Sequence, residues 1–255
     1  MDSVLEREAP ERKNDDHGAN GRCSRRRRLL AAVVALPVVA IATTYAVFFT
    51  PDSPAELQLS SQAADTAVAV PSGMWSVGEG SVAGYRVREK LLRLPASNDG
   101  VGRTSAITGA FRLSGDRSGM RVERGLRLDV DVSTLKSDDD RRDNSMRTVG
   151  IETDLYPTAT FVSTTDIVLP PGVVSGGQAA VTVEGHLTIH GVTRPVALAL
   201  QAQHTGGRIE VVGTYTFGWD QFEMKQPNKT YVTVESDPTL EFQVYFDHES
   251  AKPAF

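Results

Sequence analysis

The sequence lacks residues on which several classes of protein depend. Cys23 is its only cysteine, so no disulfide can form within the chain and no cysteine-rich metal site can be assembled. Basic residues are not in excess, with 27 Lys and Arg against 32 Asp and Glu, which argues against a nucleic-acid partner. No G-x-S-x-G segment is present to supply the nucleophile elbow of a serine hydrolase.

One segment lacks charge altogether, and it is the longest apolar run. Residues 29–49 hold no Asp, Glu, Lys or Arg, and as a helix they would extend about 31 Å, enough to cross a bilayer. Four arginines, at 25–28, precede this run, whereas residues 50–70 contain no Lys or Arg. The positive-inside rule then predicts a disordered cytoplasmic segment over 1–28 and a single-pass transmembrane signal anchor over 29–49.

These two segments place the rest of the chain outside the cytoplasm, at the cell membrane. The alternative for residues 29–49 is a cleaved signal peptide, although the apolar core of such peptides is usually shorter. Residues 50–72 are rich in Ala, Ser, Pro and Gln without a clear period, which predicts a flexible linker. A folded domain is expected over residues 73–248, followed by a C-terminal tail over 249–255.

Alternation of apolar and polar residues dominates residues 73–248. Between 126 and 132, every second residue is apolar and the residues between are charged, which is typical of a half-buried strand. Similar stretches, separated by Gly- and Pro-rich turns, predict about eight antiparallel strands in all. A closed barrel and a two-sheet sandwich are equally consistent with this pattern. Residues 137–147 break the alternation, and acids at their front predict a short helix.

Three separated segments resemble the YceI-like family of bacterial envelope proteins. Gly185–Val196, GHLTIHGVTRPV, is similar to the family signature G-x-L-T-I-x-G-V-T-R/K-P-V. Residues 132–146 are similar to its S-D…R-D strand-to-helix segment, and Tyr156–Phe161 to its Y-P-x-A-x-F strand start. The chain departs from the family at Gly84–Glu89, where S-x-V-x-F-x-V is commoner. The resemblance implies an all-β, antiparallel, lipocalin-like β-barrel of about eight strands with a short helical insert.

The apolar strand faces supply the candidate site. Composition leaves open a packed core and a hollow lumen, because small barrels can fill their interiors with side chains. The resemblance implies a hollow lumen that takes a long isoprenoid tail, with hydrophobic burial as the driving force. The expected ligand-lining residues are Phe111, Leu126, Leu128, Val130, Leu187, Ile189, Tyr215, Phe217, Phe242, Val244 and Phe246.

No catalytic residue, metal site or required cofactor is predicted. The resemblance implies a polyisoprenoid or an isoprenoid quinone as the bound molecule. His186 and His190 form an H-x-x-x-H pair, but on a strand they would lie about 13 Å apart, too far to share one ion. We expect them to be two surface histidines. The other expected partners are the membrane, through residues 29–49, and a second copy of the chain in a homodimer.

The predicted function is an exported, membrane-tethered lipid-binding protein that sequesters a polyisoprenoid or similar amphiphile in the barrel lumen. The alternatives are an envelope enzyme of lipid or stress metabolism, which would need an acid-base cluster, and an interaction module with a filled core.

The distribution of charge adds a further expectation. Residues 81–127 hold ten Lys and Arg against four Asp and Glu, which suggests either a face for anionic lipid head groups or an ordinary solvated surface.

Overall fold

The computed structural model describes residues 53–61, 70–92, 97–116, 119–230, 232–234 and 237–249. The predicted cytoplasmic segment at 1–28, the predicted anchor at 29–49 and most of the predicted tail therefore lie outside the described residues. Among the residues that are described, no helix has the length and apolar character needed to cross a membrane.

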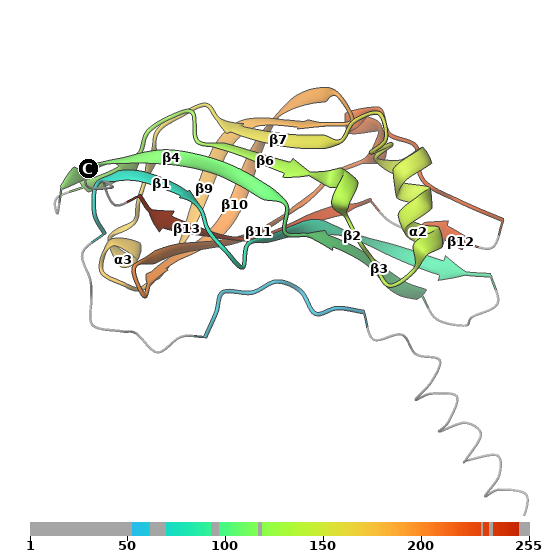
Figure 1. Ribbon diagram of the computed structural model, residues 1–255, viewed down its shortest axis with the longest axis horizontal. Coiled ribbons are helices and arrows are strands. Elements are labelled where there is room, and N and C mark those ends of the chain that lie inside the picture. The colour runs from blue at the N-terminus through green and yellow to red at the C-terminus, as the bar shows by residue number, and fades with distance from the viewer. Residues whose placement is uncertain are drawn as a thin grey trace, which may run out of the picture. The chain divides into compact units, whose positions relative to one another are not determined.

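The strands form a single antiparallel sheet, and eight of them close into a ring (Figure 1). Around the ring the order is β1, β4, β6, β7, β9, β10, β11 and β13, and β13 pairs again with β1. The ring strands are β1 (Gly73–Val77), β4 (Ile107–Asp116), β6 (Arg127–Asp131), β7 (Thr158–Ser163), β9 (Gln178–Ile189), β10 (Val192–Thr205), β11 (Arg208–Thr216) and β13 (Thr239–His248). The closed ring confirms the barrel and excludes the two-sheet sandwich.

The remaining strands extend the ring at its two ends. β13 pairs with β2 along its first half and with β1 along its last residues, and β2 in turn pairs with β3 and β12. β4 likewise pairs with β6 and then with β5, which carries β8. These strands are β2 (Val82–Leu91), β3 (Ser97–Thr104), β5 (Gly119–Val122), β8 (Ile167–Val168) and β12 (Val232–Val234).

The hairpin of β9 and β10 is the longest strand pair, with twelve partnered positions from Val192–Ile189 to Gln203–Gln178. His190 and Gly191 alone form its turn, and both have positive φ, at 54° and 72°, as a two-residue hairpin turn requires. Gly191 also leaves room for the ring of Tyr156, which a Cβ atom there would approach to 2.8 Å. Pro195 lies opposite His186, before β10 begins to pair with β11, so its missing N–H breaks no ladder.

Helices occur only as short segments between the described strands, and the predicted helix at 137–147 is confirmed. Asp139 caps it, because its carboxylate accepts a hydrogen bond of 2.8 Å from the backbone N–H of Arg141. This helix lies at the end of the barrel where β2, β3 and β12 gather, whereas α3 lies at the opposite end (Figure 1). The helical segments are η1 (Val132–Thr134), α2 (Asp140–Ser145), the π-helical turn η2 (Met146–Gly150), α3 (Pro171–Val174) and η3 (Trp219–Phe222).

Residues 53–61 belong to the predicted flexible linker, yet they lie against the outer, polar face of the barrel. The backbone N–H and the hydroxyl of Ser60 donate to Glu210 Oε1 at 2.9 and 3.0 Å. Arg86 donates to the carbonyl of Pro54 at 2.8 Å. Glu210 on β11 is only 1% exposed as a result. Burial alone would raise the pKa of Glu210, but its hydrogen bonds from Gln243, Ser60 and Gln203 hold that pKa below its usual range.

Candidate ligand-binding site

The barrel contains an apolar cavity of about 180 Å³. Strand β13 shows how the sequence forms its wall. Leu240, Phe242 and Val244 line the cavity, whereas Gln243 between them hydrogen-bonds to Glu210 at 2.6 Å on the outer face. Since successive side chains of a strand point to opposite faces, the alternation places hydrocarbon inside and polar groups outside.

The structure brings the predicted ligand-lining residues together, with one exception. Phe111, Leu126, Leu128, Val130, Leu187, Ile189, Tyr215, Phe242, Val244 and Phe246 all line the cavity. Phe217 does not. It follows the last residue of β11, and its ring packs against Phe222 of η3, with ring centroids 5.0 Å apart. Beyond the end of β11, the alternation therefore no longer predicts which side chains line the cavity.

Several cavity residues were not among the predicted ligand-lining residues. Val183, Leu198 and Ile209 share the inward parity of their strands and could have been named from it. Ile151 follows the π-helical turn η2, where no strand alternation points to the interior. Tyr85 lies on β2, whose sequence has mixed alternation, and its position in the wall depends on the neighbouring strand.

A second, polar pocket of about 380 Å³ lies beside α2. Its wall is made from η1, α2, η2 and the segment between them, and it includes Lys136, Asp143 and Arg147. Tyr85, Val132 and Leu135 line both this pocket and the apolar cavity. The barrel thus offers an apolar space and a polar space that meet at a shared wall.

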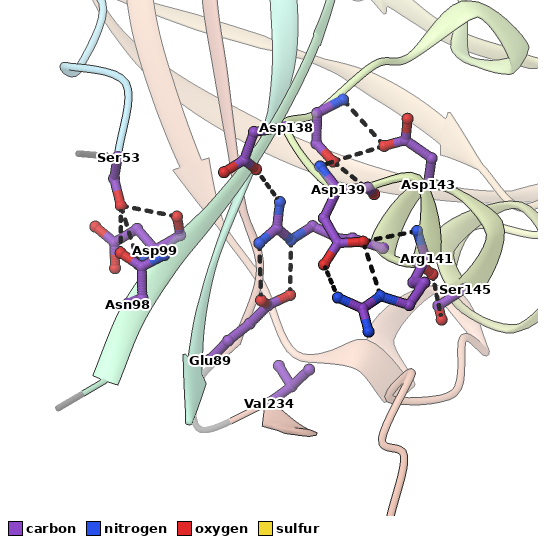
Figure 2. Close-up of polar contacts among 12 residues, drawn as sticks. Ser53, Glu89, Asn98, Asp99, Asp138, Asp139, Arg141, Asp143, Ser145 and Val234 are labelled. Atoms are coloured by element: carbon purple, nitrogen blue, oxygen red, sulfur yellow. Dashed lines mark hydrogen bonds and ion pairs between the residues drawn. The ribbon is translucent and has the colours of Figure 1, made fainter. Parts of the chain in front are cut away.

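An ion pair fastens α2 to strand β2 near this wall (Figure 2). Arg142 Nε and Nη2 donate to the two carboxylate oxygens of Glu89 at 3.0 and 3.1 Å, and the same guanidinium contacts Asp138. Gly100 on β3 makes room for the pair, because a Cβ atom there would lie 2.5 Å from Arg142 Nε. Burial alone would lower the pKa of Arg142, but the hydrogen bonds and charges of Glu89 and Asp138 raise it, so the guanidinium stays charged.

At the opposite end of the barrel, His204 of β10 lies at the edge of an aromatic cluster. Trp75 of β1 is fully buried, and its ring meets that of His204 edge-on, with centroids 6.3 Å apart. His204 is 2% exposed, and its Nε2 atom has no hydrogen-bond partner within the described part of the chain. Burial lowers the pKa of His204, because the surroundings disfavour the charged imidazolium.

This histidine should make the barrel less stable in mild acid. As the pH falls below the ordinary histidine pKa of 6.5, the unfolded chain takes up a proton at position 204 before the folded chain does, so the free energy of unfolding decreases. We expect thermal unfolding curves between pH 8 and 5 to show a falling Tm that His204→Leu flattens. His186→Leu, on the exposed face of β9, serves as the control. An equal pH dependence in wild type and His204→Leu would contradict the prediction.

The two histidines of the H-x-x-x-H pair lie in different environments. His186 is exposed on β9, as expected, but His190 is mostly buried in the hairpin turn, so its expected surface position is wrong. His190 Nε2 lies 2.6 Å from Glu152 Oε2, and its ring packs on Tyr156 with centroids 4.4 Å apart. Within the described residues, no group of three or more His, Cys, Asp or Glu side chains is arranged to hold a metal.

Three arginines of the basic stretch 81–127 form ion pairs, with Glu241 of β13 and with Asp99 of the same stretch. Arg86 pairs with Glu241 at 3.2 Å and with Asp99 at 3.4 Å, and Arg103 pairs with Glu241 at 2.7 Å. Arg88 pairs with Asp99 at 2.8 Å. These three cations are therefore paired within the protein, and a face for anionic lipid head groups stays a prediction for the stretch as a whole.

Comparison with known proteins identifies related sequences over the barrel. Residues 81–246 match the YceI-like domain. A UPF0312 protein of Pseudomonas syringae pv. tomato is 35% identical over 92 residues, 34% of this chain and 44% of that protein. A UPF0312 protein of Pseudomonas putida strain W619 is 29% identical over 123 residues, 46% of this chain and 60% of that protein. The chain thus spans about half the length of the relatives it matches.

Among solved structures, a polyisoprenoid binding domain from Saccharophagus degradans, implicated in plant cell wall breakdown, has the same fold. It aligns with a TM-score of 0.50 and 15% sequence identity, over 70% of this chain and 99% of that chain. At this level of identity, the likeness establishes the architecture of the barrel.

Proposed function

The chain belongs to the YceI-like family, and from this we propose that its barrel binds an isoprenoid lipid or a similar amphiphile in the apolar cavity. The observation that carries the proposal is the cavity itself, which is lined by apolar side chains from β4, β6, β7, β9, β10, β11 and β13 of the ring. A lipid tail placed there would exchange water for hydrocarbon, which is favourable by about 25 cal/mol for each Å² of apolar surface buried. The binding domain of the Saccharophagus neighbour supports the assignment of the ligand class.

Binding and release without covalent chemistry is the activity that this wall favours. Among the described residues that line the cavity, Glu241 is the one carboxylate, and it is held by Arg86 and Arg103. Tyr85 contributes a hydroxyl whose pKa burial raises, so it is poorly suited to act as a base. We therefore favour a carrier over an envelope enzyme of lipid or stress metabolism, and the cavity argues against a filled-core interaction module.

We further propose that residues 29–49 tether the protein to the cell membrane, with the barrel on the extracytoplasmic side. The uncharged run of 21 residues after four arginines supports this arrangement. A carrier tethered in this way would receive and release its lipid at the membrane surface. Accessibility of residues 73–248 to protease added outside intact spheroplasts would test the orientation, and full protection of the barrel would contradict it.

The ligand proposal is tested by solvent extraction of the purified full-length chain followed by mass spectrometry. We expect a polyisoprenoid, such as an isoprenoid quinone, at close to one molecule for each chain and enriched at least tenfold over the extract of the same membranes. Protein that carries only bulk membrane lipid, and takes up no prenyl lipid when it is offered, would contradict the proposal.

A further inference from the structure

The wall between the apolar cavity and the polar pocket contains a buried hydrogen-bond donor without a partner. Tyr85, which is 2% exposed, lines both spaces. Its hydroxyl oxygen is buried, and none of the described residues hydrogen-bonds to it. Leaving such a group unpaired is unfavourable, because burial has removed the water that would otherwise satisfy it.

Strand β3 holds the tyrosine ring at this boundary. Tyr85 pairs with Gly102, and a Cβ atom at Gly102 would lie 2.5 Å from the ring and 2.9 Å from the hydroxyl oxygen. The ring therefore occupies the space that any other residue at position 102 would fill. Tyr85 contributes to both walls, and Asp143 of the polar pocket is close enough to act electrostatically on its hydroxyl.

The polar pocket provides no surplus of positive charge. Lys136 Nζ lies 3.4 Å from Oδ2 of Asp143 and forms an ion pair with it. Within the described residues, this oxygen accepts no hydrogen bond. Arg147 lies 3.3 Å from Asp154 and donates to Asn144 at 2.7 Å. Asp140 adds another acid to the wall. A diphosphate or phosphate would need cations that these acids already engage, whereas a neutral polar group would not.

The protonation state of Tyr85 decides whether its hydroxyl can donate a hydrogen bond. Burial raises the pKa of its hydroxyl, Arg142 lowers it, and the charges of Asp143 and Glu89 raise it again, with a net increase above the usual range. The hydroxyl therefore remains protonated at physiological pH. A protonated hydroxyl in an otherwise apolar wall is best satisfied by an acceptor.

On the basis of the proposed function, we infer that Tyr85 is a specificity-determining residue that donates a hydrogen bond to a neutral oxygen at the polar end of the ligand. The isoprenoid tail would lie in the apolar cavity, and the polar end would extend past Tyr85, Val132 and Leu135 into the pocket beside α2. The shared acceptor chemistry is that of a hydroxyl or a carbonyl oxygen. Ligands of this kind should be preferred over prenyl phosphates and diphosphates.

The test compares three probes that share one tail: a 20-carbon prenyl alcohol, its diphosphate and the corresponding hydrocarbon without oxygen. Binding to the delipidated full-length chain is measured by native mass spectrometry from detergent micelles. We expect the wild-type chain to bind the alcohol most tightly. Tyr85→Phe should weaken binding of the alcohol by about fivefold to tenfold, the usual contribution of one hydrogen bond, and leave the hydrocarbon unchanged.

Tyr245→Phe is the matched control, because it removes a hydroxyl from the outer face of β13, where that group bonds to Ser60 and Gln243. Unchanged hydrocarbon binding shows that Tyr85→Phe is folded. The inference is overturned if Tyr85→Phe binds the alcohol as wild type does, or if the diphosphate binds wild type more tightly than the alcohol. A wild-type chain that binds none of the three probes overturns the proposed function, and the inference with it.

Discussion

Replacing Leu187 by Trp should abolish lipid retention while leaving the barrel folded. Leu187 is buried on β9 and lines the cavity, so the indole would occupy space that a lipid tail would take. Overpacking a filled core usually costs about 1–3 kcal/mol, but here the added volume enters a cavity, and we expect a loss in the free energy of unfolding below about 1 kcal/mol. Mass spectrometry of extracted lipid and a thermal melting curve provide the two measurements.

Thr188→Trp is the matched control for this substitution. Thr188 follows Leu187 on the same strand, and its hydroxyl lies 2.8 Å from that of Thr193 on the outer face of the hairpin. Its side chain must point away from the cavity, since neighbouring residues of a strand face opposite sides. Lipid content should therefore match wild type. Equal lipid loss in both variants would mean that the cavity does not hold the ligand. The same conclusion would follow if the wild-type protein carried no lipid and Leu187→Trp, but not Thr188→Trp, sharply lowered the Tm.

Removing Arg142 should destabilise the barrel strongly, because Glu89 would then be left buried with its charge uncompensated. Glu89 is 8% exposed, and the guanidinium of Arg142 contacts both its carboxylate oxygens. Breaking a buried ion pair by deleting one partner typically costs about 3–5 kcal/mol. We expect Arg142→Met to lower the free energy of unfolding by that amount, as measured by urea denaturation, with the Tm falling by roughly 10 °C.

Two further variants separate the buried pair from charge in general. Arg141 neighbours Arg142 on α2, but its side chain is 75% exposed and pairs with Asp139, so Arg141→Met should cost less than about 1 kcal/mol. The double variant Glu89→Leu/Arg142→Met removes both charges and should recover much of the stability lost in the single variant. If Arg142→Met is no less stable than Arg141→Met, the ion pair does not hold α2 in place.

The sequence alone predicted the strands and the direction in which their side chains point. Alternation in residues 126–132 predicted the strand β6, and the same parity placed Leu128 and Val130 on the face that lines the cavity. The short helix at 137–147 was also predictable, because its acidic first turn and its break in alternation are local features. Local signals of this kind depend on a few neighbouring residues, which is why one sequence is enough to identify them.

Only the tertiary structure decided which faces meet. Alternation does not distinguish a barrel from a sandwich, and the pairing of β13 with β1 settles it between residues that lie far apart in the chain. The alternation pattern also could not show that Glu241 neutralises Arg86 and Arg103, or that Gly102 leaves space for the ring of Tyr85 between the apolar cavity and the polar pocket. A side chain's parity is fixed by its own strand, whereas its partners come from strands brought alongside by folding. The charge balance and the unpaired hydroxyl of this site therefore exist only once the barrel closes.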